Sequence, residues 1–404
     1  MGARVLYSFP HKIGASRICL TAWYQAAGLA EAGAQVTVLT GAVHRPLPAE
    51  VRVRTTLARG RWRIPYRAIG PMRAFALHDR IVAHELPKLA AEIDIVHVWP
   101  LAARETLRAA RRLGIPTVLE RPNAHTGFAM RAVAQESARL GVVLPPDHEH
   151  AYNEPKLRKE EEEYRLADWL LCPSEFVVRT FLDEGFPPEQ LLRHIYGYDE
   201  QTFSPGRRPH PAPRDPNRGL QAVFVGVCAV RKGLHFALEA WLASSASATG
   251  TFRIAGEFLP EYESALAGML AHPSVEVLGH RDDVPDLMRS SDVLMLPSIE
   301  EGFGLTCTEA MGSGCVPLVS DACTELCVDG ENALIHEVGD VDALTRQLDL
   351  LDSDRERLAE LRAGCLRDAP DVTWSAAGRR LLAAYEEALA SPAPPRRTAM
   401  TEWA

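Results

Sequence analysis

The regular alternation of short apolar runs with helical patterns constrains this fold more than any other feature of the sequence. Helical patterns lie between the runs, such as residues 18–32, which Gly33 is expected to end. The runs that predict strands are 4–9, 35–41, 94–100, 116–121, 168–174 and 191–197, then 220–226, 251–256, 275–279, 292–298 and 316–321. Such alternation predicts parallel sheets with helices on both faces, which is the α/β class.

A segment rich in Pro, Arg and Gly, residues 204–219, separates the two series and reads as a linker. The 404 residues are enough for two domains of ordinary size. We expect a first doubly wound, Rossmann-like domain over residues 1–205 and a second over 206–372, with a ligand cleft between them. The amphipathic segment 373–390 is expected to pack back on the first domain, and 391–404 to form a disordered tail.

Composition narrows the class of protein. The net charge of −9 argues against a nucleic-acid binder, which usually carries a basic excess. The chain enters a strand directly at its start, and its apolar runs are too short to span a bilayer, so we expect a cytoplasmic protein. The 8 cysteines include no C-x-x-C pair, as is typical of reduced, buried thiols.

The stretch PSIEEGFGLTCTEAMGSG, residues 297–314, combines carboxylates, glycines and the start of a helix. Gly302 and Gly304 allow a ligand to approach the backbone, and the first amides of a helix at 305–312 favour an anion such as a diphosphate. Glu301 and Glu309 suit hydroxyl groups on either side of it, because an ionised carboxylate accepts from neighbouring O–H donors. The alternative is a capped helix with solvated acids.

A second anion site is expected in VFVGVCAVRKG, where Arg231 and Lys232 stand at the start of a helix. The helix dipole disfavours cations at this end, so both side chains make better sense if they reach toward a phosphate. The alternative is two exposed cations on a loop.

Five motifs resemble those of the retaining glycosyltransferases of family 4, which have the GT-B fold with two Rossmann-like domains facing across a cleft. They are EGFGLTCTE (301–309), FVGVCAVRKG (224–233), CPSEFVVRTF (172–181), YGYDEQTFSP (196–205) and DIVHVWP (94–100). The resemblance covers nearly the whole chain. It implies transfer of a sugar from a nucleoside-diphosphate sugar, UDP first and GDP next, to a hydroxyl acceptor such as a glycan, a lipid-linked or a small-molecule acceptor. It also implies retention of configuration with neither a metal nor another cofactor.

By this resemblance, Glu309 binds the ribose, Glu301 and His125 lie beside the donor sugar, and Lys232 with Arg231 neutralises the leaving diphosphate. The residues expected to bind the donor are Gly14, Gly226, Gly302, Phe303, Gly304, Leu305, Thr306 and Glu309. The residues expected to act in catalysis are His125, Glu301, Lys232 and Arg231.

The sequence departs from the family pattern in two places. Val227 stands where members often have Arg, and Gly14 is followed by Ala15 and Ser16 in place of a second glycine. A non-catalytic nucleotide-sugar-binding protein of the same fold therefore stays open as an alternative. A nicotinamide oxidoreductase is disfavoured, because no G-x-G-x-x-G follows the first strand. Two D-x-D matches, at 340–342 and 352–354, stand at expected helix starts and are interpreted as helix caps, not as metal ligands.

Residues 45–80 contain nine arginines and two acids, interleaved with Trp62, Tyr66, Met72 and Phe75. Such a segment can lie peripherally on an anionic membrane, here its inner face, or bind an acidic acceptor. A solvated surface loop is the equal alternative. The resemblance places the acceptor in the first domain, and the sequence does not identify it.

Overall fold

The computed structural model describes residues 2–59, 62–64, 69–206 and 218–395. Contacts divide the chain into two units. The first unit is formed by residues 1–126, 153–196 and 374–404, and the second by 127–152 and 197–373. Each unit is built around its own parallel sheet, which confirms the predicted pair of Rossmann-like α/β domains.

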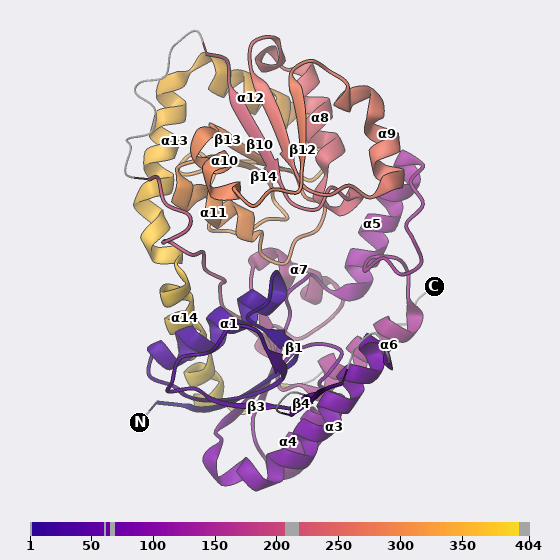
Figure 1. Ribbon diagram of the computed structural model, residues 1–404, viewed down its shortest axis with the longest axis vertical. Helices are drawn as coiled ribbons and strands as arrows, with labels where there is room; N and C mark the ends of the chain where they lie inside the picture. Colours follow the sequence, from indigo (N-terminus) through magenta and orange to yellow (C-terminus); the bar gives the residue numbers. More distant parts are fainter. Residues whose placement is uncertain (1, 60–61, 65–68, 207–217, 396–404) are drawn as a thin grey trace. The chain divides into compact units, whose positions relative to one another are not determined.

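The first unit has a sheet of seven parallel strands in the order β3-β2-β1-β6-β7-β8-β9. Figure 1 labels β1 and β3 of this sheet. Its strands are β1 (Arg4–Ile13), β2 (Gln35–Val43), β3 (Arg52–Thr55), β6 (Ile95–Val98), β7 (Thr117–Glu120), β8 (Trp169–Cys172) and β9 (Leu191–Arg193). A two-stranded antiparallel ribbon, β4 (Ala58–Arg59) and β5 (Trp62–Arg63), stands apart from this sheet.

Helices cover both faces of the first sheet. They are α1 (Ile18–Glu31), α3 (Pro71–Leu89), α4 (Arg104–Leu113), α6 (Glu154–Leu166), α7 (Glu175–Asp183) and α14 (Trp374–Ala390). Successive strand residues point to opposite faces, so Val5 and Tyr7 of β1 join a core with α1 and α14. Leu6 joins the opposite core, with α3, α4, α6 and α7.

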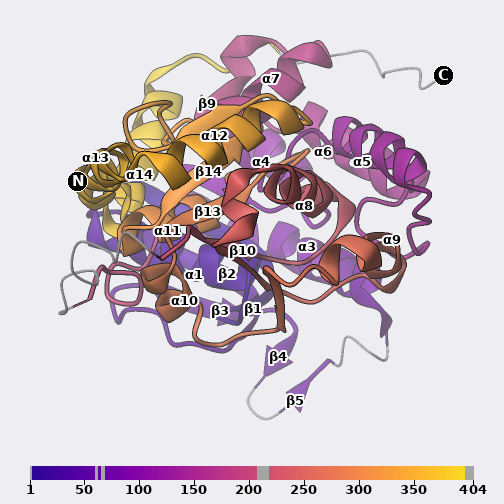
Figure 2. The same cartoon turned by 90° about the horizontal axis from the view of Figure 1, so that it is seen from above.

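The second unit has six parallel strands in the order β12-β11-β10-β13-β14-β15. They are β10 (Gln221–Val225), β11 (Thr251–Ala255), β12 (Val275–Gly279), β13 (Val293–Leu296), β14 (Val316–Ser320) and β15 (Leu334–His336). Its helices are α5 (Thr126–Leu140), α8 (Leu234–Ala243), α9 (Pro260–Leu270), α10 (Val284–Ser290), α11 (Leu305–Ser313), α12 (Val341–Ser353) and α13 (Arg355–Asp368). Helices α8 and α12 pack side by side (Figure 2).

The strand order of each sheet reverses direction once, between β1 and β6 in the first unit and between β10 and β13 in the second. At such a point the loops that follow the two strands diverge, which opens a crevice at the carboxyl ends of the strands. In the second unit these are the two loops that the sequence motifs single out.

All eleven predicted strands are present, with small differences in their bounds. β1 runs on through Pro10 to Ile13, four residues beyond the prediction. It pairs with β6 only as far as Ser8, so the missing N–H of Pro10 interrupts no hydrogen bond on that side. β3 was not predicted, because its four residues are exposed and carry no apolar pattern.

The predicted boundary at residue 205 differs from the observed division in two segments, 127–152 and 197–205, which both belong to the second unit. Residues 127–152 pack within the second unit, because Val133 and Val142 join its apolar core. His235 Nε2 of α8 also lies 2.9 Å from Glu136 Oε1 of α5. Residues 207–217 of the predicted linker and 396–404 of the predicted tail lie outside the described residues.

Helix α14 crosses α1 at two glycines of the first unit. A Cβ atom added to Gly378 would lie 2.5 Å from the carbonyl carbon of Gly28, closer than any side chain allows. The aromatic rings of Tyr24 and Trp374 stack beside this crossing, with centroids 4.9 Å apart. The two helices therefore approach to backbone contact. No helix of the described part of the chain combines the length and the apolar character that crossing a bilayer requires.

We expect Gly378→Ala to destabilise the protein by about 1–3 kcal/mol, because the added methyl group must push the two helix backbones apart. Gly268→Ala in α9 is the matched control: nothing lies within 4 Å of its Cβ position, so the helix should gain about 0.5–1 kcal/mol. Urea unfolding followed by tryptophan fluorescence measures both. Equal unfolding midpoints for the two variants would contradict the close crossing.

Candidate active site

Two loops meet at the carboxyl ends of β10 and β13 in the second unit. The N–H of Ile299 donates to the carbonyl of Arg231 at 2.8 Å. Gly233 has φ 65° and fits against the β13 loop, where a Cβ atom would lie 1.9 Å from the carbonyl oxygen of Pro297. Glycine at this position is therefore required both by conformation and by space.

The acids of one loop are paired with the cations of the other. Lys232 Nζ forms an ion pair with Glu301 Oε1. Arg231 NH1 donates to the backbone carbonyl of Glu300 at 2.8 Å and lies 3.3 Å from Glu300 Oε2 and 3.5 Å from Glu301 Oε2. The side chains of Glu300 and Glu301 are 0% and 6% exposed, and those of Arg231 and Lys232 are 16% and 14% exposed. The alternatives of solvated acids and of exposed cations are both wrong.

These charges stabilise one another against desolvation. Burial opposes ionisation of Glu301, yet Lys232 and Arg231 together hold the pKa of its carboxyl below the ordinary value. Burial likewise opposes the charge on Arg231, while Glu301 and Glu300 raise its pKa. Glu301 and Arg231 are therefore both charged at neutral pH.

Two members of this cluster were not predicted from the sequence: Glu300, as a partner of Arg231, and His150. His150 is 5% exposed, and its Nε2 lies 3.3 Å from Glu300 Oε2. It comes from the segment that follows α5, some 150 residues earlier in the chain. Only the fold brings these residues together, so no local pattern could have indicated the contact.

The helix start predicted after the glycine loop is present. Gly304, with φ 77°, precedes the first residue of α11, and Phe303 is 2% exposed. Leu305 and Thr306 form the first turn of the helix, where amides have no acceptor inside the helix and can bind an anion. Gly302 lies in the same loop, between Glu301 and this turn.

Glu309 lies in the middle of α11 and is half-buried. Burial raises the pKa of its carboxyl to about 8, and the nearby Asp199 adds to the rise. Asp199 accepts hydrogen bonds from the N–H of Gln201 and the hydroxyl of Thr202, so its side chain is held in place. A carboxyl in this state gains from hydroxyl donors that stabilise its ionised form.

Gly226 follows β10 with φ 146°, and its Cβ position lies 4.0 Å from Cε of Lys232. The lysine side chain therefore runs close to this glycine. Val227, which replaces the arginine common in the family pattern, is 42% exposed. Arg231 is the arginine that the structure places beside Glu300 and, together with Lys232, beside Glu301.

The two remaining predicted site residues, Gly14 and His125, belong to the first unit. Gly14 has φ 78°, and a Cβ atom there would lie 2.5 Å from Cβ of Arg45. His125 is fully buried, with Nε2 3.1 Å from Glu161 Oε1 and its ring against Phe181. Their contacts with a donor stay predictions.

The D-x-D matches divide into two roles. Asp340 accepts from the N–H of Ala343 and Asp354 from the N–H of Arg357, so both cap helices as predicted. Asp342 lies in the first turn of α12. Asp352 does not cap a helix: it accepts from the N–H of Leu220 and forms an ion pair with Arg355 at 3.0 Å.

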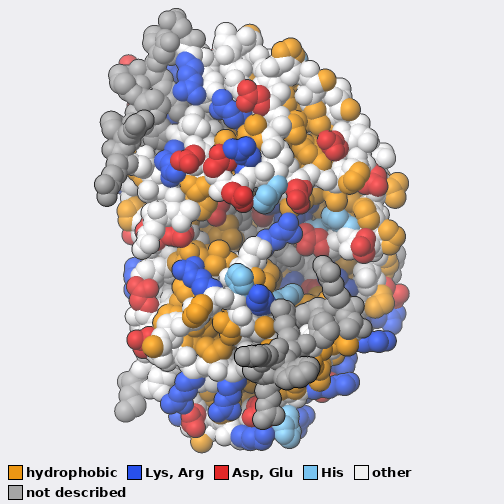
Figure 3. All heavy atoms as spheres, viewed as in Figure 1, with side chains coloured by type: hydrophobic (Ala, Val, Ile, Leu, Met, Phe, Trp, Pro, Cys, Tyr) orange, Lys and Arg blue, Asp and Glu red, His pale blue; other side chains and the backbone are white. Residues whose placement is uncertain are grey.

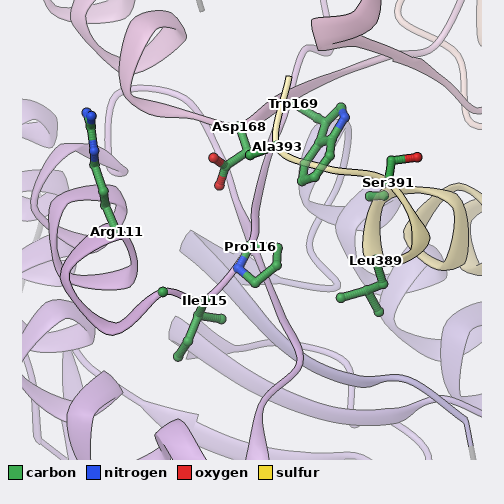
Figure 4. A pocket seen from close by; sticks show the side chains of 10 residues that line it. Arg111, Ile115, Pro116, Asp168, Trp169, Leu389, Ser391 and Ala393 are labelled. Carbon is green, nitrogen blue, oxygen red and sulfur yellow. The ribbon is translucent and has the colours of Figure 1, made fainter. Parts of the chain in front are cut away.

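A cavity of about 240 Å³ lies in the first unit, at the amino ends of β7 and β8 and beside the end of α14 (Figure 4). Trp169, Leu389 and Pro116 supply its apolar wall, and Arg111 stands at its edge. Ligands of doubly wound sheets bind at the carboxyl ends of the strands, so this cavity is not a candidate for the nucleotide.

Two family models match the chain. One described as Glycosyltransferase Family 4 matches residues 21–196, and one described as Glycosyl transferases group 1 matches residues 219–354. The chain is 26% identical to a D-inositol 3-phosphate glycosyltransferase of Acidothermus cellulolyticus, over 93% of this chain and 85% of that protein. It is 24% identical to a sulfoquinovosyl transferase of Arabidopsis thaliana, over 87% of this chain and 67% of that protein.

Solved structures agree with these matches. Sucrose-phosphate synthase from Thermosynechococcus elongatus has a TM-score of 0.69 at 17% identity, over 96% of this chain and 100% of that one. Anabaena HepE in complex with UDP has a TM-score of 0.63 at 17% identity, over 95% of this chain and 100% of that one. These likenesses confirm the GT-B fold.

We expect Glu309→Gln to stabilise the ligand-free protein, in a manner that depends on pH. Below about pH 4 the carboxyl is protonated both folded and unfolded, so the variant should match the wild type. As pH rises toward 8, the unfolded carboxyl ionises while the folded one resists, and the wild type loses stability. The advantage of Gln should reach on the order of 1–3 kcal/mol at pH 7 and level off above the folded pKa.

Urea unfolding of the wild type and Glu309→Gln between pH 4 and 9 measures this difference. Glu261→Gln, in the first turn of α9, is the control, because its exposed carboxylate should make no comparable contribution. A stability difference that is independent of pH would contradict the raised pKa of Glu309 in the folded protein.

Proposed function

The chain belongs to glycosyltransferase family 4, and on this premise we propose that it transfers a sugar from a nucleoside-diphosphate sugar to a hydroxyl acceptor with retention of configuration. The observation that carries the proposal is the arrangement within the second unit. A cluster of buried acids and cations lies directly before the first turn of α11, and Glu309 follows on the same helix.

Each part of this arrangement suits one part of such a donor. The diphosphate lies at the start of α11, where the amides of Leu305 and Thr306 and the helix dipole favour an anion. Glu309 accepts hydrogen bonds from the ribose hydroxyls, which relieves the cost of its buried ionised form. Glu301 lies one turn before the helix, beside the place of the donor sugar.

Lys232 and Arg231 stabilise the charge that develops on the leaving diphosphate. Both are held by carboxylates of the β13 loop, so their positions are fixed by the fold itself. A diphosphate that approaches competes with Glu300 and Glu301 for them. The leaving phosphate oxygen takes the acceptor's proton, so the reaction needs no protein base. Because the two cations neutralise the diphosphate, it needs no metal either.

UDP is the first nucleotide to test, because the similar structure of HepE was solved in complexes with UDP and with UDP-glucose. The acceptor class to test first is a phosphorylated polyol, since the relatives that match most of the chain are named for D-inositol 3-phosphate. A glycan and a lipid-linked acceptor are the further candidates.

Peripheral membrane contact remains part of the proposal. Arg73, Arg80 and Lys88 of α3 are exposed, as are Arg111 and Arg112 of α4. Figure 3 shows Lys and Arg side chains gathered at the lower edge of the view, where Figure 1 draws α3 and α4. Of the predicted basic segment, Arg61, Tyr66 and Arg67 lie outside the described residues.

We expect UDP, tested beside GDP, ADP and NAD without metal, to raise the melting temperature of the wild type by mass action. Glu309→Ala should weaken this stabilisation, because loss of a charge-assisted pair of hydrogen bonds costs about 1.5–3 kcal/mol, or roughly tenfold or more in affinity. Stabilisation by NAD alone, or by none of the four, would contradict the proposed donor class.

Lys232→Met should lower the rate of sugar transfer by roughly 10²- to 10³-fold, because the leaving diphosphate loses a preorganised cation. It should also destabilise the protein, because Glu301 is left buried without that partner. The double variant Lys232→Met/Glu301→Gln separates the two effects: it should recover stability and not the rate. Recovery of the rate would contradict the role of Lys232, and nucleotide binding without any transfer by the wild type would favour the non-catalytic alternative.

A further inference from the structure

Ser298 donates a hydrogen bond to the carboxylate of Glu301 within the second unit. Its hydroxyl oxygen lies 3.1 Å from Glu301 Oε1, and its side chain is fully buried. The two residues are three positions apart in the β13 loop. The N–H of Ile299, between them, donates to the carbonyl of Arg231 at 2.8 Å. The serine hydroxyl is therefore held inside the loop that carries the proposed sugar contact.

A second serine fixes the backbone of the first. Ser320 is the last residue of β14 and is 1% exposed, and its hydroxyl donates to the carbonyl of Ser298 at 2.6 Å. β13 and β14 pair in parallel as far as Leu296 and Val319, so this hydrogen bond lies just beyond the end of their pairing. The position of Ser298 thus depends on the sheet and not on its own loop alone.

The two carboxylate oxygens of Glu301 have different surroundings. Oε1 accepts from Ser298 and forms the ion pair with Lys232. Oε2 accepts no hydrogen bond from the described residues, and Arg231 NH1 lies 3.5 Å from it, longer than the roughly 2.7–2.9 Å of a charge-assisted hydrogen bond. Each oxygen of a carboxylate can accept about two hydrogen bonds. Oε1 is therefore filled, while Oε2 keeps room for hydroxyl donors.

We propose that Ser298 is a positioning residue, which holds Oε1 of Glu301 in place and thereby presents Oε2 to neighbouring hydroxyl groups of the donor sugar. The inference rests on the proposed function, because that function places Glu301 beside this sugar. When the diphosphate draws on Lys232, Ser298 is the donor that keeps Oε1 fixed. Without Ser298 the carboxylate can rotate, and binding of the sugar must first order it.

This role predicts that Ser298 affects the sugar part of the donor and not its nucleotide part. We therefore define the sugar ratio as the dissociation constant of a nucleoside diphosphate divided by that of its sugar nucleotide. Effects on the nucleotide cancel in this ratio. Calorimetry first compares UDP, UDP-glucose, UDP-galactose, GDP and GDP-mannose on the wild type, and the sugar nucleotide that binds most tightly is used with its parent nucleotide.

The test is a double-mutant cycle of the wild type, Ser298→Ala, Glu301→Gln and the double variant. Ser244→Ala is the matched control, because its buried hydroxyl donates to the backbone carbonyl of Trp241 at 2.8 Å in the same unit. Melting temperatures of all five proteins show how far each substitution affects stability alone.

We expect Ser298→Ala to lower the sugar ratio roughly threefold to tenfold, the size of one lost hydrogen bond. Its affinity for the nucleoside diphosphate should stay close to that of the wild type. In the Glu301→Gln background the same substitution should leave the ratio nearly unchanged, because the charged group that Ser298 orients is gone. Ser244→Ala should keep the wild-type ratio, even where it lowers the melting temperature as much as Ser298→Ala does.

A Ser298→Ala ratio equal to that of the wild type overturns the role of Ser298 and leaves the proposed function intact. An equal reduction in both backgrounds indicates an effect that does not act through Glu301, and it also overturns the inference. Binding of a nucleoside diphosphate but of neither class of sugar nucleotide overturns the place of Glu301 beside the sugar, and the inference with it. Failure of the wild type to bind any of these nucleotides overturns the proposed function itself.

Discussion

The pairing of buried carboxylates with cations from the neighbouring loop is the interaction on which the candidate site depends. Glu300 and Glu301 lie side by side, almost completely removed from water, and two adjacent negative charges are not stable there alone. Arg231 and Lys232 compensate them across the point where the sheet order reverses. Breaking a buried pair costs far more than forming it gains, so this cluster fixes the two loops relative to each other. The same cations are then available, without further ordering, to a diphosphate.

The first unit follows the same rule around Glu120, at the end of β7. This carboxylate is fully buried and lies 3.0 Å from His194 Nε2 and 3.3 Å from His97 Nε2, and it accepts from the hydroxyl of Tyr196. Burial opposes its ionisation, yet the two histidines hold the pKa of Glu120 well below its ordinary range. His97 also lies 2.5 Å from the hydroxyl of Tyr385 in α14, so the last helix is joined to the centre of the first sheet by a polar contact.

The sequence predicts the sheets, the loops and the helix start well, because each depends on residues that are close together in the chain. Apolar runs mark the strands, and glycines mark the turns after β10 and β13. What the sequence could not supply were contacts that only the fold creates. His150 reaches Glu300 from another part of the chain, and Asp199 comes close to Glu309. The burial of Arg231 could not be predicted either, because a cation on an exposed loop and a cation in a buried ion pair can have the same local sequence.

The interleaving of the two units has a consequence for how this chain is made. A ribosome releases the first unit's sheet early, but α14, which closes one face of that sheet, emerges only after the residues of the second unit. Until then, the apolar face formed by Val5 and Tyr7 lacks part of its cover and is open to aggregation. Likewise, a fragment that begins after the linker would contain the second unit's sheet but lack α5. The part of the second unit's apolar core that Val133 and Val142 cover would then be exposed to water. Neither unit is a continuous piece of chain, so each completes its core with segments that lie far apart in the sequence.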